Sequence, residues 1–209
     1  MKFENVDIRW LGHATFMIRG EGKIIYFDPF VLPENPEKAD LILITHDHYD
    51  HCDPEEVEKL KKAGTIIITT PKAAGKLSGN VKTMKEGDEI IEKGIKIKAV
   101  PAYNIEKNFH PKGSGIGFIV EIEGTRIYHA GDTDLIPEMS NIKTDIALLP
   151  IGGTYTMNEE EGARAALKIK PKIAIPMHYG YISGTFAEPN RFKELIQEEN
   201  PAIRVEILK

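Results

Sequence analysis

Residues 44–54, ITHDHYDHCDP, place three histidines and two aspartates within six positions, from His46 to His51. The segment ends an apolar run, ADLILIT, that is typical of a strand buried on both faces. The residues DPEE that come next are typical of the first turn of a helix. We therefore expect the cluster in a strand-to-helix turn, where several polar side chains can face one point.

Imidazole nitrogens and carboxylate oxygens are common ligands of Zn²⁺ and similar divalent ions. His46 and His48 lie two positions apart, so both can face one side of an extended turn, whereas Asp50 and His51 can face an adjacent position. The spacing predicts that the first pair binds one metal ion and the second pair binds another. A single histidine is more often an ordinary surface or core residue, but three within six positions favour a metal site.

Two further candidate ligands follow strand-type segments elsewhere in the chain. Asp132 lies in IYHAGDTD, where its carboxylate could bridge two metal ions, and His178 lies in IAIPMHYG. Each comes after a β-type run and before a glycine or a loop. Active sites of layered folds collect at such strand ends, so we expect both side chains near the histidine cluster.

Strand-type segments occur in two halves of the chain, and each half then turns to helix. Hairpin turns are expected at the GEG of residues 20–22 and within IEGTR, and helices are expected from residue 54, over 157–169 and over 189–199. A closing strand is expected in AIRVEIL. Since no segment has a linker composition, residues 1–209 are predicted to form one α/β domain, with two sheets face to face and helices outside.

The composition narrows the compartment and the partners. The 209 residues include 27 basic and 32 acidic side chains, a net charge of −5, which disfavours a nucleic-acid partner and a cationic membrane-binding face. The one cysteine, Cys52, excludes an internal disulfide. The segment MKFENVDIRW has no apolar core of a signal peptide, and no apolar run approaches the roughly 20 residues of a membrane span. We expect a cytoplasmic protein without membrane association.

The motifs THDHYDH, HAGDTD and IPMHYG, in this order and spacing, resemble the metallo-β-lactamase superfamily. WLGHATFMI, FDPF and LLPIGGTYTM are similar to the branch of ascorbate-6-phosphate lactonase-like hydrolases and, more distantly, to N-acylphosphatidylethanolamine phospholipase D. The similarity covers nearly the whole chain, although no motif is specific for a substrate. It implies a four-layer αββα sandwich of two mixed β-sheets flanked by helices, with the metal ions at one edge of the sheets.

The resemblance also implies a ligand set for two metal ions: His46 and His48 at the first, Asp50, His51 and His178 at the second, and Asp132 between them. The family has one more histidine at the first ion, in a Pro-Ala-aromatic-His context. Here VPAYN places Asn104 at that position. Asn104 could bind through its carbonyl oxygen, His110 of EKNFHPKG could fold back into the site, or the first site could be open. We favour His110.

The implied activity is that of a hydrolase with two divalent ions, Zn²⁺ or alternatively Mn²⁺, whose bound hydroxide cleaves a small ester, lactone or phosphodiester. Asp50 is the expected catalytic residue, because it could orient the hydroxide and handle its proton. An RNA-processing-type nuclease of the same superfamily and a non-catalytic metal-binding protein are the alternatives. A homo-oligomer is left open, since no surface stripe identifies an interface.

Other residues have expected supporting roles. Asp28 in FDPF would hold the ligand turn by hydrogen bonds, with ordinary turn chemistry before Pro29 as the alternative. His13 in LGHAT would contact the substrate or a ligand carboxylate. His129 lies inside a strand and is expected to be structural, and Cys52 is expected to be a small buried residue. Four tyrosines are expected near the mouth of the site: Tyr103, Tyr155, Tyr179 and Tyr181.

Overall fold

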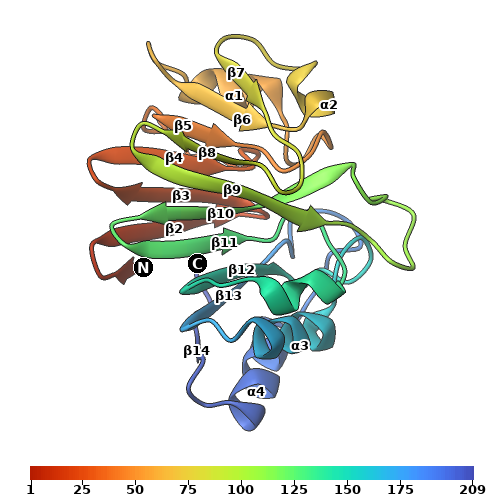
Figure 1. The fold of residues 1–209 in the computed structure, drawn as a ribbon. Helices are drawn as coiled ribbons and strands as arrows, with labels where there is room; N and C mark the ends of the chain where they lie inside the picture. The colour runs from red at the N-terminus through yellow and green to blue at the C-terminus, as the bar shows by residue number, and fades with distance from the viewer.

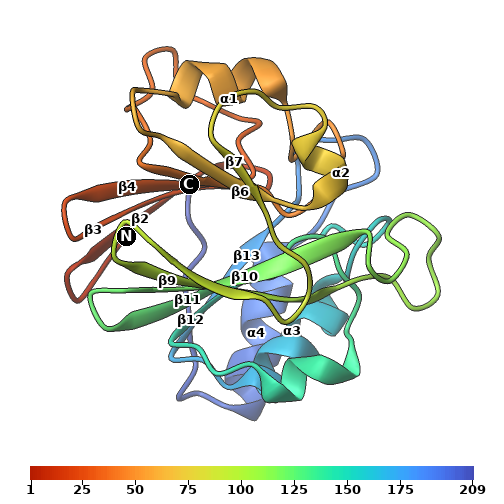
Figure 2. The ribbon, with the colours of Figure 1, turned by 45° about the horizontal axis from the view of Figure 1, so that its top comes forward.

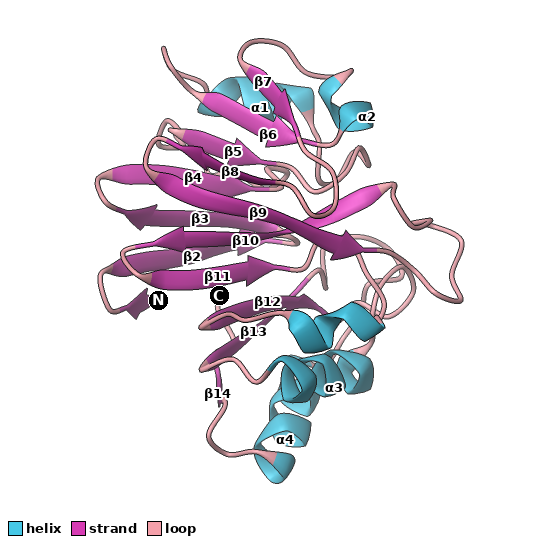
Figure 3. Ribbon diagram, in the orientation of Figure 1, coloured by secondary structure: helices cyan, strands magenta, loops and turns pink.

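Two seven-stranded β-sheets face each other in the computed structural model, which describes residues 1–209 (Figures 1 and 3). The strands of the first sheet follow the order of the chain. They are β1 (Lys2–Phe3), β2 (Val6–Gly12), β3 (Thr15–Gly20), β4 (Lys23–Phe27), β5 (Leu41–Leu43), β6 (Ile66–Thr69) and β7 (Val81–Thr83).

The second sheet contains the later strands in the order β14 to β8. They are β8 (Glu89–Glu92), β9 (Ile95–Ala102), β10 (Gly115–Ile122), β11 (Thr125–His129), β12 (Ile146–Pro150), β13 (Ile173–Met177) and β14 (Arg204–Val205). In each sheet the first four strands pair antiparallel and the last four pair parallel. The two halves of the chain therefore repeat one pattern of strand pairing.

The core follows from the alternation of side chains along the strands. Ile25 and Phe27 of β4 point into the main apolar cluster of 44 buried residues, which includes side chains of both sheets. Tyr26, between them, points to the other face and joins a smaller cluster that contains Val57 and Leu60 of the first helix. Both faces of the first sheet are therefore buried where helices cover it.

Helices form the two outer layers: α1 (Pro54–Leu60), α2 (Pro71–Ala74), a 3₁₀ helix (Pro137–Asn141), α3 (Glu159–Ile169) and α4 (Pro189–Glu199). Figure 2 shows α1 and α2 over the first sheet and α3 and α4 over the second. The side chain of Asp53 accepts hydrogen bonds from Glu55 N and Glu56 N and so caps α1, while Asn158 and Glu161 form a capping box at α3. None of the helices combines the length and the apolar composition that a membrane crossing requires.

The predicted fold class, two mixed sheets flanked by helices, is confirmed. Three local expectations differ. The single-turn helix α2 and the 3₁₀ helix did not stand out in the sequence, because one turn has no helical periodicity to detect. The closing strand is confined to Arg204–Val205, although an apolar run from residue 202 to 208 predicted a longer one. The assignment of residues 1–209 to a single domain stays a prediction.

Candidate metal centre

Six of the seven histidines of the chain meet at one end of the two sheets, together with Asp50 and Asp132. Each comes from a segment that follows a strand, as expected of a site in a layered fold. His13 follows β2, the segment from His46 to His51 follows β5, His110 lies in the loop after β9, Asp132 follows β11 and His178 follows β13. The sheets therefore deliver these side chains to one place from positions up to 165 residues apart, from His13 to His178.

The segment from His46 to His51 is a tight turn between β5 and α1. The backbone nitrogens of His51 and Cys52 both donate to the carbonyl oxygen of His48, at 3.1 and 2.8 Å. Gly115, the first residue of β10 in the other sheet, leaves space for this turn. A Cβ atom at Gly115 would lie 3.3 Å from Cβ of His46. Close approach of the two sheets thus places the turn at the end of the second sheet.

Asp28, directly after β4, holds this turn by three hydrogen bonds. Its carboxylate accepts from the backbone nitrogen of Thr45, the hydroxyl of Thr45 and Nδ1 of His51, each at 2.7 Å. Since the carboxylate only accepts, Nδ1 of His51 must carry the proton, and Nε2 keeps its lone pair for a metal ion. These contacts are the ones expected of a residue that orients the ligand turn.

The same logic fixes the tautomer of His46. The Thr45 hydroxyl donates its only hydrogen to Asp28, so it must accept from Nδ1 of His46, which lies 2.9 Å away. Nε2 of His46 is then unprotonated, and it is buried with no hydrogen-bond partner. Asp28 therefore orients two histidines, one directly and one through Thr45.

The first group of possible ligands contains His46, His48 and His110, whose nitrogen atoms lie within 4.8 Å of one another. His110 reaches it from the loop after β9, and its Nε2 lies 3.1 Å from Nδ1 of His48. Asn104 lies beside this group, and its amide oxygen accepts hydrogen bonds from His110 instead of facing the other two histidines. Of the three explanations for Asn104, the geometry supports the one in which His110 occupies the position.

Hydrogen bonds leave the Asn104 amide only one orientation. Its Nδ2 donates to Asp134 Oδ1 and to the carbonyl oxygen of Tyr155, both at 3.0 Å. Its Oδ1 accepts from the backbone nitrogen and Nδ1 of His110, at 2.9 and 3.0 Å. Lys107 Nζ, 2.7 Å from Asp134 Oδ1, fixes the carboxylate in turn. Both lone pairs of the Asn104 oxygen are used, so this oxygen has none left for a metal ion.

The second group contains His13, Asp50, His51 and His178. Asp50 Oδ2 lies 2.9 Å from Nε2 of His13, 3.3 Å from Nε2 of His51 and 3.9 Å from Nε2 of His178. His13 thus contacts the carboxylate of Asp50, a predicted metal ligand. Its Nδ1 is buried without a partner.

Asp132 lies between the two groups and contacts both. Its Oδ1 is 3.3 Å from Nε2 of His51, and its Oδ2 is 3.3 Å from Nε2 of His110 and 3.0 Å from Nε2 of His178. One carboxylate therefore faces side chains of the first and of the second group. This is the arrangement that a bridging ligand requires.

The donor set fits divalent metal ions in two respects. First, Nε2 of His46, His51 and His178 and Oδ1 of Asp132 are buried without a hydrogen-bond partner, which is costly unless another group satisfies them. Second, two ligands at the 2.0–2.1 Å distances of a tetrahedral zinc site lie about 3.3 Å apart. The separations of 3.0 to 3.3 Å around Asp132 match that spacing.

Burial keeps several of these histidines neutral. It lowers the pKa of His46 well below the usual value and also lowers the pKa of His110. Burial lowers the pKa of His13 to about 4, although its hydrogen bond to Asp50 acts in the opposite direction. A neutral imidazole can bind a metal ion without first losing a proton.

His51 behaves differently because three carboxylates surround it. Burial opposes its charged form, but Asp132, Asp50 and Asp28 outweigh burial and raise its pKa well above the usual value. Burial would likewise raise the pKa of Asp132, yet His178 and His51 hold this pKa well below the usual range. The three carboxylates that favour a proton on His51 would equally favour a metal cation at its Nε2.

Three residues of the centre have left-handed backbone conformations that side chains usually avoid. The φ angles are 51° at His13, 41° at Asp28 and 59° at His178. The backbone nitrogen of His178 donates to the carbonyl oxygen of His13 at 2.9 Å, which ties two of these residues together. A Cβ atom at Gly152 would lie 2.3 Å from the carbonyl oxygen of His178, so only glycine fits there. Backbone strain of this kind is typical of functional sites.

His129 and Cys52 lie outside the cluster. Nε2 of His129 donates to the carbonyl oxygen of Ala14 at 2.9 Å, its Nδ1 accepts from Gly131 N, and its ring stacks on Phe27. Both ring nitrogens are therefore used inside the core. Cys52 belongs to the smaller apolar cluster, and burial raises the pKa of its thiol to about 11.

The four tyrosines differ in their distance from the centre. Tyr155 lines the cavity above it, and the ring of Tyr181 lies 6.5 Å from the ring of His13. Tyr179 stacks on Trp10, with 5.2 Å between the ring centroids. The Tyr103 hydroxyl donates to Glu138 at 3.0 Å, so this residue points elsewhere.

The centre opens into a cavity of about 430 Å³. The cavity combines metal-ligand types, apolar side chains and one lysine in its lining: His48, Asp50, His110 and Asp132, then Tyr49, Phe109, Tyr155 and Ile182, and finally Asp47 and Lys76. Its volume is in the range of small-molecule sites.

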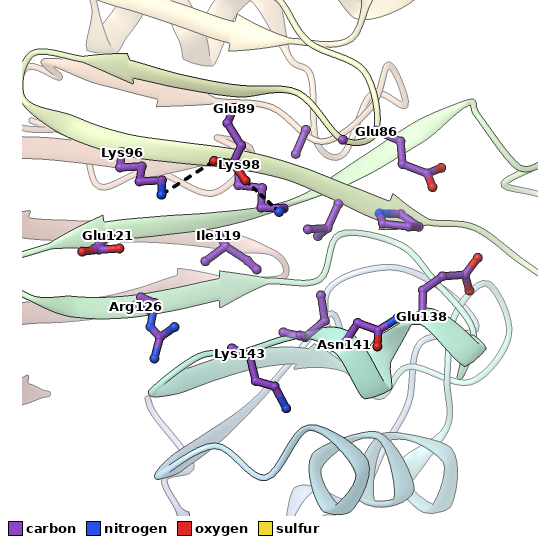
Figure 4. Close-up of a pocket in the computed structure, with 15 residues that line it drawn as sticks. Glu86, Glu89, Lys96, Lys98, Ile119, Glu121, Arg126, Glu138, Asn141 and Lys143 are labelled. Atoms are coloured by element: carbon purple, nitrogen blue, oxygen red, sulfur yellow. Dashed lines mark hydrogen bonds and ion pairs between the residues drawn. The ribbon is translucent and has the colours of Figure 1, made fainter.

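A second hollow, of about 440 Å³, lies on the outer face of β9, β10 and β11 and shares no lining residue with the first (Figure 4). Its lining contains no histidine. Its lining has four acidic and four basic side chains, and Lys98 Nζ and Lys96 Nζ lie 2.7 and 3.6 Å from Glu89. The charges of the lining therefore sum to zero, and this hollow lacks the imidazole donors of the histidine centre.

Four residues around the centre did not stand out in the sequence. Thr45 directly precedes the histidine cluster, and Asp134 is the last residue of HAGDTD, so position in a motif was an available signal for both. Gly152 belongs to LLPIGGTYTM, which was used only for its resemblance to a family branch. Lys76 had no signal in the sequence, because only the fold brings it to the cavity.

Residues 7–178 match the family model of the β-lactamase superfamily domain. A UPF0173 metal-dependent hydrolase of Thermoplasma acidophilum is 40% identical, over 92% of this chain and 91% of its own length.

Solved structures agree with these matches. A crystal structure described as a candidate metal-dependent hydrolase from Parabacteroides distasonis has a TM-score of 0.87 and 36% identity, and covers 98% of this chain and 94% of its own. Igni18, a metallo hydrolase of Ignicoccus hospitalis, has a TM-score of 0.81 and 28% identity, with 98% and 95% coverage. The similarity thus extends over nearly the full length of each chain.

Proposed function

We propose that this chain, which belongs to the β-lactamase superfamily and to its UPF0173 metal-dependent hydrolases, is a hydrolase with two metal ions. Its substrate would be a small ester, lactone or phosphodiester. The observation that carries the proposal is the position of Asp132 between two groups of donor atoms. One such group alone would fit a structural metal. Two groups that share a carboxylate fit the paired sites of hydrolases.

In this proposal the ligands follow the two groups, except that His13 is not a ligand. His46, His48 and His110 bind the first ion, Asp50, His51 and His178 bind the second, and Asp132 binds both. The bare Nε2 atoms of His46 and His51, each set by a hydrogen bond at Nδ1, support this division. Nitrogen and carboxylate donors suit Zn²⁺, with Mn²⁺ as the alternative.

Two divalent ions held there would lower the pKa of water and polarise the scissile bond. The residues of the chain would then position the reactants. Asp50, at the boundary of the cavity, would orient the attacking water and take up its proton. His13, 2.9 Å from Asp50 Oδ2, would hold this carboxylate in place. His13 is fully buried, so it would act through Asp50 rather than on the substrate.

The proposed substrate range follows from the chemistry of the centre. Esters, lactones and phosphodiesters all require attack by water and stabilisation of a developing oxyanion. The lactonase-like branch suggested by WLGHATFMI and FDPF favours a lactone. A cytoplasmic location, a small-molecule substrate and a possible homo-oligomer complete the proposal, with nucleic acid disfavoured by the net charge of −5.

The two alternative functions have less support. Asn104 in place of a histidine suggested a non-catalytic protein, but the grouping of His110 with His46 and His48 supports a complete first site instead. An RNA-processing nuclease stays an alternative that salt-sensitive RNA binding would favour.

The first experiment is to measure the metal content per chain after loading with Zn²⁺ or Mn²⁺ and removing excess ion. We expect about two ions per parent chain, and about one in His110→Ala, since one of the two groups loses a ligand. His48→Ala and His178→Ala should likewise lose metal and activity while keeping the fold. The loaded protein should hydrolyse γ-lactones or bis(p-nitrophenyl) phosphate.

No histidine of the chain is exposed, so a surface histidine cannot serve as a control. His129→Ala is the available control, since His129 is buried yet outside both groups. One ion per parent chain, unchanged in His110→Ala, would rule out the two-metal centre.

A further inference from the structure

Lys76 stands at the wall of the cavity beside the candidate metal centre. It follows α2 directly after Gly75, and its backbone nitrogen donates to the carbonyl oxygen of Ala73 at 3.0 Å. Its ammonium group donates to the backbone carbonyl oxygen of Asp47 and lies 3.3 Å from Asp47 Oδ2. Because Asp47 lies between His46 and His48, these contacts hold a positive charge close to the first donor group.

The charge of Lys76 is not needed to neutralise Asp47. Lys72 Nζ lies 3.2 Å from the same Oδ2 atom, so two ammonium groups share one buried carboxylate. These three residues together have a net charge of +1. A lysine ammonium group has three hydrogens, and Asp47 accepts at two positions, so one donor of Lys76 stays available. Only Lys76, and not Lys72, lines the cavity.

Beside the ligand-type side chains, Asp47 and Lys76, the cavity lining consists of four aromatic or apolar side chains: Tyr49, Phe109, Tyr155 and Ile182. Tyr49 and Phe109 are 65% and 47% exposed, so both present apolar surface that a bound molecule could cover. Phe109 packs edge-to-face on Tyr155 with 4.8 Å between the ring centroids, and Ile182 lines the same cavity. The cavity thus combines metal-ligand side chains, an apolar wall and a single available cation.

We propose that Lys76 binds a carboxylate of the substrate, so that this centre acts on anionic esters or lactones with a short apolar segment between the carboxylate and the scissile bond. The inference rests on the proposed function, because the metal centre holds the scissile group. A substrate of this kind would use the three parts of the cavity at once: donor groups, apolar wall and ammonium group. Lys76 would select substrates and would take no part in bond cleavage.

The test compares two hydroxamic acids by calorimetry on the zinc-loaded protein. Hexanohydroxamic acid and adipic acid monohydroxamate have the same chain length and the same metal-binding end, but only the second ends in a carboxylate. We expect the second probe to bind about tenfold more tightly, a modest value because the Lys76 side chain is 45% exposed. Since no bond is cleaved, the measurement does not depend on activity.

Lys76→Met should remove the tenfold difference between the probes. Lys72→Met is the matched control, because it removes an ammonium group from the same carboxylate but outside the cavity. It should retain most of the difference, since Lys76 keeps its available N–H donor even though the net charge of the group falls by one. Hexanohydroxamic acid also reports in each variant whether the metal centre is intact.

Each other outcome contradicts the inference in a distinct way. Equal binding of the two probes by the parent would overturn the role of Lys76 and leave the proposed hydrolase standing. Equal losses in Lys76→Met and Lys72→Met would show a general charge effect and overturn the direct contact. Failure of both probes to bind would refute the metal centre and the inference together.

Discussion

The amide oxygen of Asn104 accepts hydrogen bonds from both the backbone nitrogen and the ring Nδ1 of His110, at 2.9 and 3.0 Å. The residue that departs from the family pattern therefore orients the histidine that lies in the expected ligand position. Asp134 and Lys107 hold the amide in this orientation from the other side. His110, six residues further along the chain, thus lies where it could take the place of the absent histidine.

Asn104→Ala should weaken zinc binding at the first site by about 10- to 100-fold, the usual effect of removing a residue that orients a metal ligand. The ring of His110 would lose the acceptor that fixes its tautomer and position. Zinc affinity can be measured by competition with a chromogenic chelator. Asn108→Ala, an exposed asparagine of the same loop, is the control and should bind zinc like the parent. Equal affinity of Asn104→Ala and the parent would exclude the positioning role.

Asp28→Asn should lower both stability and metal affinity. Asparagine tolerates the left-handed backbone at this position, so the substitution tests the charge and the hydrogen bonds rather than the backbone. The new amide group would face donors at Thr45 and His51, and the loss should be about 2–3 kcal/mol in the free energy of unfolding. Urea unfolding of metal-free protein measures this cost, and chelator competition measures metal affinity. A stable variant with full metal affinity would contradict the role of Asp28.

His129→Ala should lower the stability of the protein without changing its metal content. Its buried ring bridges the sheets by stacking on Phe27, so truncation should cost about 3 kcal/mol of stability. Neither ring nitrogen faces the donor groups, so the metal content per folded chain should match the parent. Thermal unfolding and elemental analysis on the same preparation give both values. A loss of metal without a loss of stability would contradict the purely structural role of His129.

The metal-free protein should become less stable as the pH falls from about 6.5 to about 4, because His13 has its pKa lowered to about 4 by burial. In this window the unfolded chain binds the proton and the folded chain does not, so protonation favours unfolding. The contribution of His13 is fully present above pH 6.5 and is on the order of 3 kcal/mol. His46 and His110, with lowered pKa values, act in the same direction.

His13→Gln isolates this effect, since glutamine does not titrate. Urea unfolding of chelator-treated parent and variant at about pH 7.5 and about pH 5 should show a smaller pH dependence in the variant. The same change of stability with pH in both proteins would contradict the assigned cause.

The sequence by itself determined the fold class and the central turn. Apolar runs such as ADLILIT predict buried strands, because backbone hydrogen bonding and burial impose a simple pattern on each run. Capping residues such as Asp53 predict a helix start in the same local way. The cluster from His46 to His51 needed no tertiary information, since its members are neighbours in the chain.

Only the tertiary structure decided how distant residues complete the centre. His110 belongs to an irregular loop, and its position depends on hydrogen bonds of Asn104 to Asp134 and Tyr155, which lie 30 and 51 residues away in the chain. The cavity position of Lys76 likewise depends on where α2 packs. Local patterns cannot specify such contacts, because they depend on the packing of two sheets against each other and on which side chains that packing brings within hydrogen-bonding distance.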